Sequence, residues 1–393
     1  MNFKFYINDD VKKQVDDMCH EFGLDFTTAV NMFIKATVRE NGIPFYMKPS
    51  IVNEVIAERK EKLAKEYFEE IDIALDRYPK EEREKTREKI LNDIYNIDAV
   101  SNLSIKEYFE LSLYKIAKDE WIATYLSDSD TKTIKNQLNT PVKGIDMGSK
   151  YVCYEQLKKY YHREITCLRT ITDKYNFVFF VKKHGQVFIK PIIGSIGNGT
   201  EILKYEDVKD WDLYVHTKLE QYKYGIIAEE LVIQDDDMAV FHKSSVNTIR
   251  VTTLRLNDGI HTHAYMRVGT GNSIVDNVGK NGIICKLDQN TGEIIETCNA
   301  KGQKFEYHPD NNIKLIGSKV PLFENVITLA KEIAYTIPHY RYIGFDFAKV
   351  NDQWVLIEFN NKTGIVSVQT ALDRGLKKEF LQIFKELGKE TIF

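Results

Sequence analysis

The apolar residues at the start of the chain first alternate and then recur at helical spacing. Residues 2–7 alternate between apolar and polar positions, which predicts a short half-buried strand. Helices are expected from Asn8 to about Phe22 and from near Thr27 to Asn41, because apolar residues return there every three or four positions. A small β-α-α unit is therefore expected at the start of the chain.

The pattern of charged and apolar residues changes twice further along the chain. Residues 49–145 are dominated by charged helical sequences, and the run KEEREKTREK alternates in sign, which is typical of a solvated helix face. From about Lys150 the sequence changes to strand-like runs separated by Gly, Asn and Asp. Three parts are expected: the unit at 1–48, a helical region at 49–145, and a mixed α/β (α+β) domain at 146–393.

The expected strands of the last part are apolar runs. They are FVFFV at 177–181, QVFIKPI at 186–192, YGIIAEELVI at 224–233, NTIRVTTLRL at 247–256, HTHAYMRV at 261–268, RYIGFDFAKV at 341–350 and QWVLIEF at 353–359. Between them, VITLAKEIAYTI at 326–337 predicts a helix.

Composition narrows the class of protein. A hydrophobic fraction of 43% can fill a core, and a formal charge of −4 argues against a generally basic nucleic-acid binder. The five cysteines are scattered without a CxxC pair, which fits a reducing compartment and disfavours a disulfide scaffold or zinc ribbon. No stretch reaches the ~18 apolar residues of a membrane span. A soluble cytoplasmic protein is expected.

A lysine before a glycine-rich turn is the first candidate for chemistry. Lys190 ends a strand-like run, and residues 194–199 (GSIGNG) follow it. Glycines let backbone N–H groups approach an anion, and a lysine adds a compact positive charge. No GK[ST] follows the glycines, so the segment is not a Walker A loop. A flexible hairpin loop beside an exposed lysine is the alternative.

An acidic pair lies inside a later apolar run. Glu229 and Glu230 interrupt residues 226–233, and burying such a pair is costly unless partners are present. A carboxylate there could accept from an adenine amino group or a ribose hydroxyl. The alternative is that both glutamates lie at an exposed strand end.

The pair of runs near the end of the chain predicts a metal site. If residues 351–353 form a three-residue loop, antiparallel pairing sets Asp346 opposite Glu358. Asp346, Glu358 and Asn360 then share one face, while Phe345, Phe347, Ile357 and Phe359 share the other. Three oxygen ligands on one face suit Mg²⁺. An ordinary amphipathic hairpin with its polar face in water is the alternative.

Taken in order, these pieces resemble the ATP-grasp superfamily. More narrowly, the chain is similar to the sugar-transfer-associated branch of that superfamily, from about residue 105 to 390. The similarity lies in the blocks Gly148-Ser149-Lys150-Tyr151 with YYHRE, FIKPIIGSIGNGTEI, SSVNTIRVTTLRL, MRVGTGNSIVDNVGKNGI and GFDFAKV…VLIEFNN.

The resemblance implies an ATP-grasp fold and a site for ATP and Mg²⁺. It implies that Lys150 and Lys190 contact the phosphates of ATP. The loop closing over these phosphates would contain Gly194, Ser195, Gly197, Asn198 and Gly199. The adenine hinge would contain Glu229, Glu230, Leu231 and Val232, and Mg²⁺ would be held by Asp346, Glu358 and Asn360.

The resemblance also implies residues that act on the substrates. Asn247, Arg250 and Arg267 would lie on strands leading to the cleft, and one arginine would stabilise charge on the transferring phosphoryl group or on the tetrahedral intermediate. A structural salt bridge is the alternative for either arginine. Asp276 and Asn277 would belong to a substrate-side loop. The family more usually has consecutive glycines where this chain has residues 280–282 (KNG), which leaves the acceptor open.

Residues 1–46 resemble a different family, the ribbon-helix-helix antitoxins of the RelB/DinJ type. In such proteins, strands from two chains pair and enter the major groove, so Asn2, Lys4 and Tyr6 would face DNA. One lysine per strand gives little attraction to phosphate. A homodimerisation module, or a vestige of a fusion, is therefore favoured over DNA binding.

The favoured function is an ATP-dependent carboxylate–amine ligase that forms an amide through an acyl-phosphate. Its small-molecule or glycan-linked substrates would belong to the synthesis of cell-surface polysaccharide, as the resemblance implies. The alternatives are a kinase on the same scaffold and a DNA-binding regulator whose C-terminal domain senses ATP.

Overall fold

The structure is a computed structural model. It describes residues 9–21, 23–39, 49–194, 198–273, 276, 282–361 and 363–389. The chain divides into two compact units, residues 1–62 and residues 63–393. Each unit is described below by itself.

The first unit contains two helices that pack against each other. Helix α1 spans Asp9–Glu21 and α2 spans Phe26–Arg39. Between them Gly23 has a φ of +67°, a left-handed conformation that favours glycine. Both helices confirm the sequence prediction, whereas the predicted strand at residues 2–7 lies outside the described residues. Helix α3 (Pro49–Glu66) begins in this unit.

The second unit begins with the predicted helical region. Capping boxes at Ser104 and Ser127 fix the starts of two of its helices. Buried side chains of this region share one hydrophobic core with the last two helices of the chain. The helices of the region are α4 (Phe68–Leu75), α5 (Lys80–Val100), α6 (Ile105–Glu110), α7 (Lys118–Thr124) and α8 (Asp128–Leu138).

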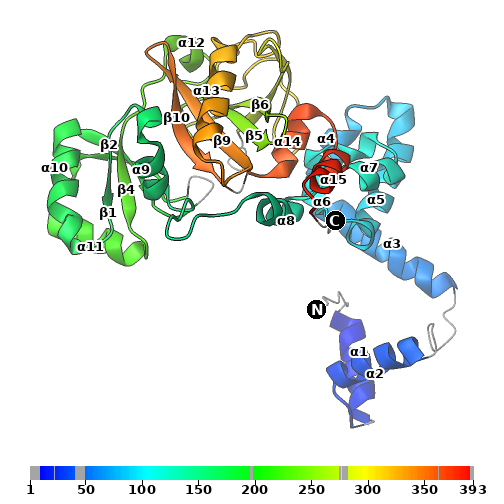
Figure 1. The fold of residues 1–393 in the computed structure, drawn as a ribbon. Helices are drawn as coiled ribbons and strands as arrows, with labels where there is room; N and C mark the ends of the chain where they lie inside the picture. Colours follow the sequence, from blue (N-terminus) through cyan, green and yellow to red (C-terminus); the bar gives the residue numbers. More distant parts are fainter. Residues whose placement is uncertain are drawn as a thin grey trace. The chain divides into compact units, whose positions relative to one another are not determined.

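A large antiparallel sheet forms the centre of the second unit (Figure 1). Within the described residues it has six strands in the order β10-β9-β5-β6-β7-β8, and every neighbouring pair is antiparallel. The strands are β5 (Thr248–Arg255), β6 (Ile260–Val268), β7 (Ile283–Leu287), β8 (Ile294–Cys298), β9 (Tyr342–Val350) and β10 (Gln353–Asn360).

Helices cover both faces of the large sheet. Helix α13 (Phe323–Thr336) shares a core with alternate residues of β5, β6 and β9. The intervening residues pack with α14 (Ile365–Leu372), α15 (Lys377–Glu386) and the helical region. On this second face the apolar side chains give way to Arg250, Arg267 and Asp346, which lie on three neighbouring strands. These three charged side chains therefore lie together on one part of this face.

A small antiparallel sheet lies beside the large one. In the part of the chain that the structure describes, it has four strands in the order β1-β4-β2-β3. Helices α10 (Lys174–His184) and α11 (Trp211–Gln221) bury one of its faces. Helix α9 (Lys150–Tyr161) contacts both β1 and β10. The strands are β1 (Ile165–Leu168), β2 (Gln186–Pro191), β3 (Glu201–Lys204) and β4 (Ile226–Glu230).

The sequence prediction of a strand at 177–181 is wrong. The run FVFFV lies in helix α10, where Phe177, Phe180 and Val181 are buried at helical spacing. Tyr175 and Phe179 are exposed on the same helix. The other expected strands and the predicted helix at 326–337 are confirmed, so the mixed α/β class is confirmed as well.

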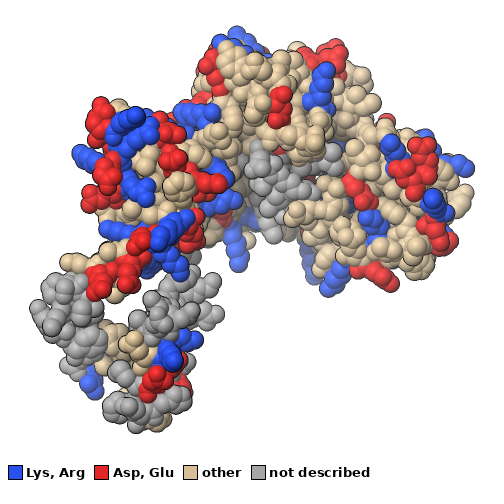
Figure 2. All heavy atoms as spheres, turned by 180° about the vertical axis from the view of Figure 1, so that it is seen from behind, with Lys and Arg blue, Asp and Glu red and all other residues tan. Residues whose placement is uncertain are grey.

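The structure also shows the distribution of charge, the state of the cysteines and the character of the helices. On the face shown in Figure 2, basic and acidic side chains of the described residues are interspersed. All five cysteines are buried thiols, none of them in a disulfide. Among the helices that the structure describes, none is long and apolar enough to cross a membrane.

We expect Glu110 to destabilise the fold at alkaline pH. Burial and the nearby Asp128 carboxylate raise the pKa of Glu110 to about 7. The unfolded chain ionises this group near pH 4.3, so the folded state binds more protons between that pH and about 7, and stability falls as the pH rises through this window. Glu110→Gln should therefore raise Tm at pH 8 by several degrees and leave it nearly unchanged at pH 4.5. A Tm gain of equal size at both values would contradict this account.

Candidate active site

A cleft of about 940 Å³ lies between the two sheets and gathers most of the residues singled out in the sequence. Its volume is at the upper end of the range for ligand sites, ~300–1,000 Å³. Of the predicted site residues, those that line it are Lys150, Lys190, Gly194, Asn198, Glu229, Glu230, Leu231, Val232, Arg250, Arg267, Asp276, Asp346, Glu358 and Asn360.

Glu229 is buried in an ion-paired cluster at the small sheet. Its carboxylate receives Lys190 Nζ at 2.5 Å on one oxygen, and Arg163 Nε and Nη2 at 3.0 and 2.7 Å on the other. Burial by itself would raise the pKa of Glu229, but Lys190 and Arg163 outweigh it and hold the pKa below its usual value. Glu229 is only 4% exposed, so the alternative of an exposed strand end does not hold for it.

Strand pairing explains why these groups meet. Phe188 lies opposite Glu229, and Lys190 lies opposite Ile227 on the adjacent strand. Because side chains alternate, Val187 and Ile189 enter the core of the small sheet while Phe188 and Lys190 face the cleft. The sequence therefore positions Lys190 by an ordinary two-residue period.

Lys150 reaches the cleft from the start of α9. Ser149 caps this helix, and the backbone N–H of Lys150 donates to the Ile192 carbonyl at 3.1 Å. The side-chain ammonium donates to the carbonyl of Gly194 at 2.7 Å and lies 3.5 Å from Glu358 Oε1. Lys150 therefore joins the first residue of the glycine-rich turn to the strand that carries Glu358.

The hairpin of β9 and β10 confirms that Asp346 lies opposite Glu358, but by a different route. The loop contains two residues, Asn351 and Asp352, both with positive φ, as expected for a tight hairpin turn that favours Asn and Asp. A β-bulge between Leu356 and Glu358 then restores the pairing that a three-residue loop would give.

The bulge also moves one side chain to the other face. Two successive residues, Ile357 and Glu358, line the cleft, whereas Leu356 and Phe359 are buried on the opposite side. The predicted place of Ile357 on the apolar face with Phe359 is therefore wrong. The extra residue breaks the strict two-residue alternation on which that prediction relied.

Asp346 is held by two arginines at the centre of the cleft. Arg250 pairs with both of its oxygens, Nη2 at 2.9 Å, and Arg267 Nη2 lies 2.9 Å from Oδ2. Asn360 Nδ2 adds a donor at 3.2 Å. Burial would raise the pKa of Asp346, but the two arginines outweigh it and lower that pKa. Asp346 is therefore a carboxylate at neutral pH.

The three predicted oxygen ligands of Mg²⁺ lie in one cleft. Asp346, Glu358 and Asn360 face the same cleft, and Glu358 keeps 32% of its side chain exposed. Within the described residues no cluster of three or more His, Cys, Asp or Glu side chains could hold a metal. Mg²⁺ commonly takes one or two carboxylates and completes its shell with phosphates and water. The donor set therefore suits a metal that arrives with phosphates.

Asp276 lies next to the arginine pair. It accepts hydrogen bonds from the N–H of Thr248, at 3.0 Å, and from the Thr248 hydroxyl, and it lies 3.4 Å from Arg267 Nη2. Burial raises the pKa of Asp276 even though Arg267 opposes the shift. Asp276 and Asp346 thus have opposite shifts within one cleft.

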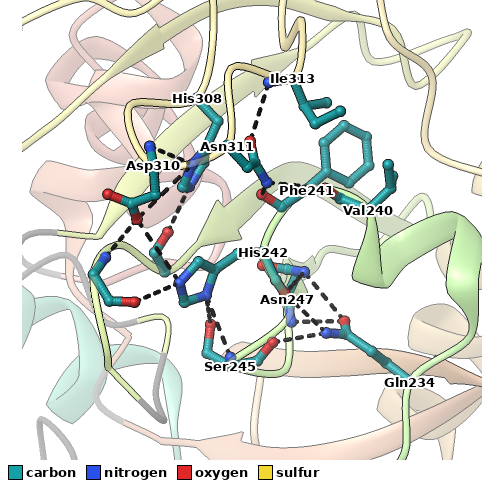
Figure 3. A network of polar contacts seen from close by, with 12 residues as sticks. Gln234, Val240, Phe241, His242, Ser245, Asn247, His308, Asp310, Asn311 and Ile313 are labelled. Carbon is teal, nitrogen blue, oxygen red and sulfur yellow. Dashed lines mark hydrogen bonds and ion pairs between the residues drawn. The ribbon is translucent and has the colours of Figure 1, made fainter.

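Asn247 belongs to a buried polar network (Figure 3). Its amide nitrogen donates to the carbonyls of Met238 and His242 at 2.8 and 2.9 Å, and Gln234 accepts from its backbone N–H at 2.9 Å. The network joins the end of the hinge segment to the segment that enters β5, beside helix α12 (Asp236–Ala239). The role of Asn247 at the cleft stays a prediction.

The remaining predicted residues are Ser195, Gly197, Gly199 and Asn277. Ser195, Gly197 and Asn277 lie outside the described residues. Gly199 has a φ of +73°, and a Cβ atom there would lie 2.6 Å from the Tyr222 hydroxyl, so this position requires glycine for backbone reasons.

Sequence reasoning missed several residues of the site, among them Arg163, Thr248 and Lys243. Arg163 follows α9 and lines the cleft beside Glu229, Thr248 begins β5, and Lys243 lines the cleft from the segment before that strand. Arg163 and Lys243 lie outside the predicted strands and give no periodic signal, whereas Thr248 lies within the predicted strand at 247–256. A buried arginine such as Arg163 becomes recognisable only when its partners from distant strands are known.

Two models of known protein families match the chain. A family model described as sugar-transfer associated ATP-grasp matches residues 120–385, and a model of the RelB antitoxin matches residues 2–70. No curated protein matches the chain.

Solved structures show distant similarity. The D-alanyl-alanine synthetase A of Vibrio cholerae is 12% identical with a TM-score of 0.41, over 61% of this chain and 65% of that one. The D-alanine–D-alanine ligase of Helicobacter pylori is 12% identical with a TM-score of 0.40, over 64% of this chain and 63% of that one. The chain thus spans slightly less than two thirds of each solved chain.

Proposed function

Because the chain belongs to the sugar-transfer associated ATP-grasp family, we propose that it is an ATP-dependent carboxylate–amine ligase. ATP phosphorylates a carboxylate, an amine attacks the resulting acyl-phosphate, and ADP and phosphate leave. One observation carries the proposal: Lys150 from helix α9 converges on a single cleft with Lys190, Asp346 and Glu358 from the two sheets.

The nucleotide end of the cleft follows from the cluster around Glu229. The backbone of Glu230, Leu231 and Val232 leaves strand β4 along the cleft and would bind the adenine edge. Lys190, on the neighbouring strand, and Lys150, at the glycine-rich turn, would bind the phosphate oxygens as compact cations. Residues 194–199 would close over the same phosphates.

The reacting end follows from the cluster around Asp346. Asp346, Glu358 and Asn360 would hold Mg²⁺, which when bound neutralises phosphate charge and orients the transferring group. Arg250 and Arg267 are held by Asp346 and would stabilise the negative charge that develops in the reaction. Asp276 and Asn277 would face the acceptor. The family description suggests an acceptor or donor from cell-surface polysaccharide synthesis.

Trapping with hydroxylamine tests the reaction type. Purified protein is incubated with Mg-ATP, hydroxylamine, and pools of amino acids or uronic acids as carboxylates. We expect ADP release with formation of a hydroxamate, because hydroxylamine intercepts an acyl-phosphate. ADP release with a stable phosphorylated product and no hydroxamate would indicate a kinase instead. Absence of any Mg-dependent ATP binding by calorimetry would exclude both reactions.

For the N-terminal unit we propose homodimerisation. The RelB model covers residues 2–70, and helix α2 exposes the apolar side chains of Met32 and Val38. Light scattering on the full chain and on a chain that begins at residue 49 tests the proposal. If both proteins contain the same number of chains per particle, the proposal is contradicted. A gel shift at low salt would test DNA binding separately.

A further inference from the structure

Arg163 connects the two sheets at the back of the cleft. It lies between α9 and β1, and only 5% of its side chain is exposed. On the small sheet it forms two hydrogen bonds to Glu229. On the large sheet it donates to the carbonyls of Leu356 and Ile357, at 2.6 and 3.2 Å.

Every N–H of the guanidinium has an acceptor in the described part of the chain. Nε and Nη2 bind Glu229, Nη2 also binds the Ile357 carbonyl, and Nη1 binds the carbonyls of Leu356 and Tyr161. Its plane also lies over the Tyr161 ring, 4.8 Å from the ring centre. A planar group with five donors in a fixed fork suits this arrangement, and a lysine could not reproduce it.

The two carbonyls that Arg163 binds belong to the β-bulge of β10. A bulge interrupts the ladder, so its backbone groups need partners from elsewhere. Arg163 supplies these partners at Leu356 and Ile357, the residues directly before Glu358. The bulge is also what places Glu358 on the cleft side, opposite Asp346.

We infer that Arg163 is a positioning residue. It couples Glu229, at the proposed nucleotide end of the cleft, to Glu358, the proposed ligand of Mg²⁺. The inference rests on the proposed function and adds to it a physical link between the two ends of the site. Glu229 sets the orientation of the guanidinium, and the guanidinium holds the bulge. Nucleotide binding at the small sheet and metal binding at the large sheet should therefore reinforce each other.

The coupling is measured as the ratio of ATP affinities with and without Mg²⁺. Arg163→Lys keeps a positive charge for Glu229 but loses the fork to the bulge. We expect nucleotide affinity without metal to stay near that of the wild type, and the Mg²⁺-dependent gain to fall by about 10-fold or more, as is typical when an outer-shell partner of a metal ligand is lost. A purely structural role would lower Tm and leave the ratio unchanged.

Arg169→Lys is the matched control. Arg169 follows β1 as an exposed arginine, with its guanidinium 5.6 Å from the ring centre of Tyr151. We expect its affinity ratio to equal that of the wild type. Glu229→Gln provides a second variant, because it leaves Arg163 in place and weakens its link to the nucleotide strand. The ratio should fall in this variant too.

The outcomes separate the two hypotheses. A wild-type protein whose ATP affinity does not depend on Mg²⁺ would overturn both the proposed function and the coupling. A wild-type protein with a clear Mg²⁺-dependent gain, retained in full by Arg163→Lys or by Glu229→Gln, would overturn the coupling alone.

Discussion

Glu358→Gln is expected to remove Mg²⁺-dependent ATP turnover while leaving Tm close to the wild-type value. Glu358 keeps part of its side chain exposed, and within the described part of the chain its ion pair is the 3.5 Å contact with Lys150. An ion pair of this kind contributes about 0–1 kcal/mol to stability. As a metal ligand, however, its carboxylate should matter by more than about 100-fold in turnover, the upper end of the loss seen for outer-shell partners.

Asp346→Asn should behave differently, because its carboxylate is buried between two arginines. Removing that charge leaves Arg250 and Arg267 without their shared counter-ion. Breaking a buried ion pair in this way typically costs about 3–5 kcal/mol, so this variant should lose both turnover and Tm.

The measurements are ADP release and thermal unfolding, both with and without Mg²⁺. Glu332→Gln is the matched control, since Glu332 pairs with Lys159 at 3.4 Å on the surface. It should change neither quantity. Full turnover in Glu358→Gln would show that Glu358 is not a metal ligand. An unchanged Tm in Asp346→Asn would show that the two arginines do not depend on the Asp346 carboxylate for stability.

Lys190→Gln is expected to lower turnover by about 10²–10³-fold, the range for removal of one pre-oriented charge-stabilising donor. Lys190 is buried, and its ammonium is held 2.5 Å from the Glu229 carboxylate, so its charge is pre-oriented in the cleft. The loss should appear in the affinity for ADP as well as for ATP if the lysine binds a phosphate common to both.

Calorimetric titration with ADP and with ATP checks this prediction. Lys182→Gln is the control, because Lys182 is an exposed lysine on α10, the helix that packs on the same small sheet as Lys190. Its affinities should match the wild type. Unaltered nucleotide affinity in Lys190→Gln would show that Lys190 serves only to neutralise Glu229.

The spacing of apolar residues predicted most of the helices and strands. It gave the wrong element where the same run fits both a helix and a strand. The run at 177–181 is aromatic and β-branched, which favours a strand, but its buried positions recur at helical spacing and it packs as α10 against the small sheet. Strands β1 and β3 of the small sheet were not predicted, and neither were β7 and β8 of the large sheet. Strand β7 pairs with β6 and with β8, and partners remote in sequence decide that these short segments join the sheet.

The hairpin of β9 and β10 has the predicted pairing for a different structural reason. A three-residue loop and a two-residue turn followed by a bulge give the same pairing of Asp346 with Glu358. Only the bulge explains why Ile357 lines the cleft and why Arg163 binds two strand carbonyls. A bulge adds one residue without a compositional signal that distinguishes it from a longer loop.

The sequence by itself determined the strands that carry Lys190, Glu229, Asp346 and Glu358, because a two-residue period fixes which side chains share a face. Only the tertiary structure decided which of these faces meet and how their charges are paired. Burial makes that pairing essential, since a carboxylate such as Asp346 is stable inside the protein only when cations from other strands surround it. Those cations come from positions that are distant along the chain, and no local pattern contains that information.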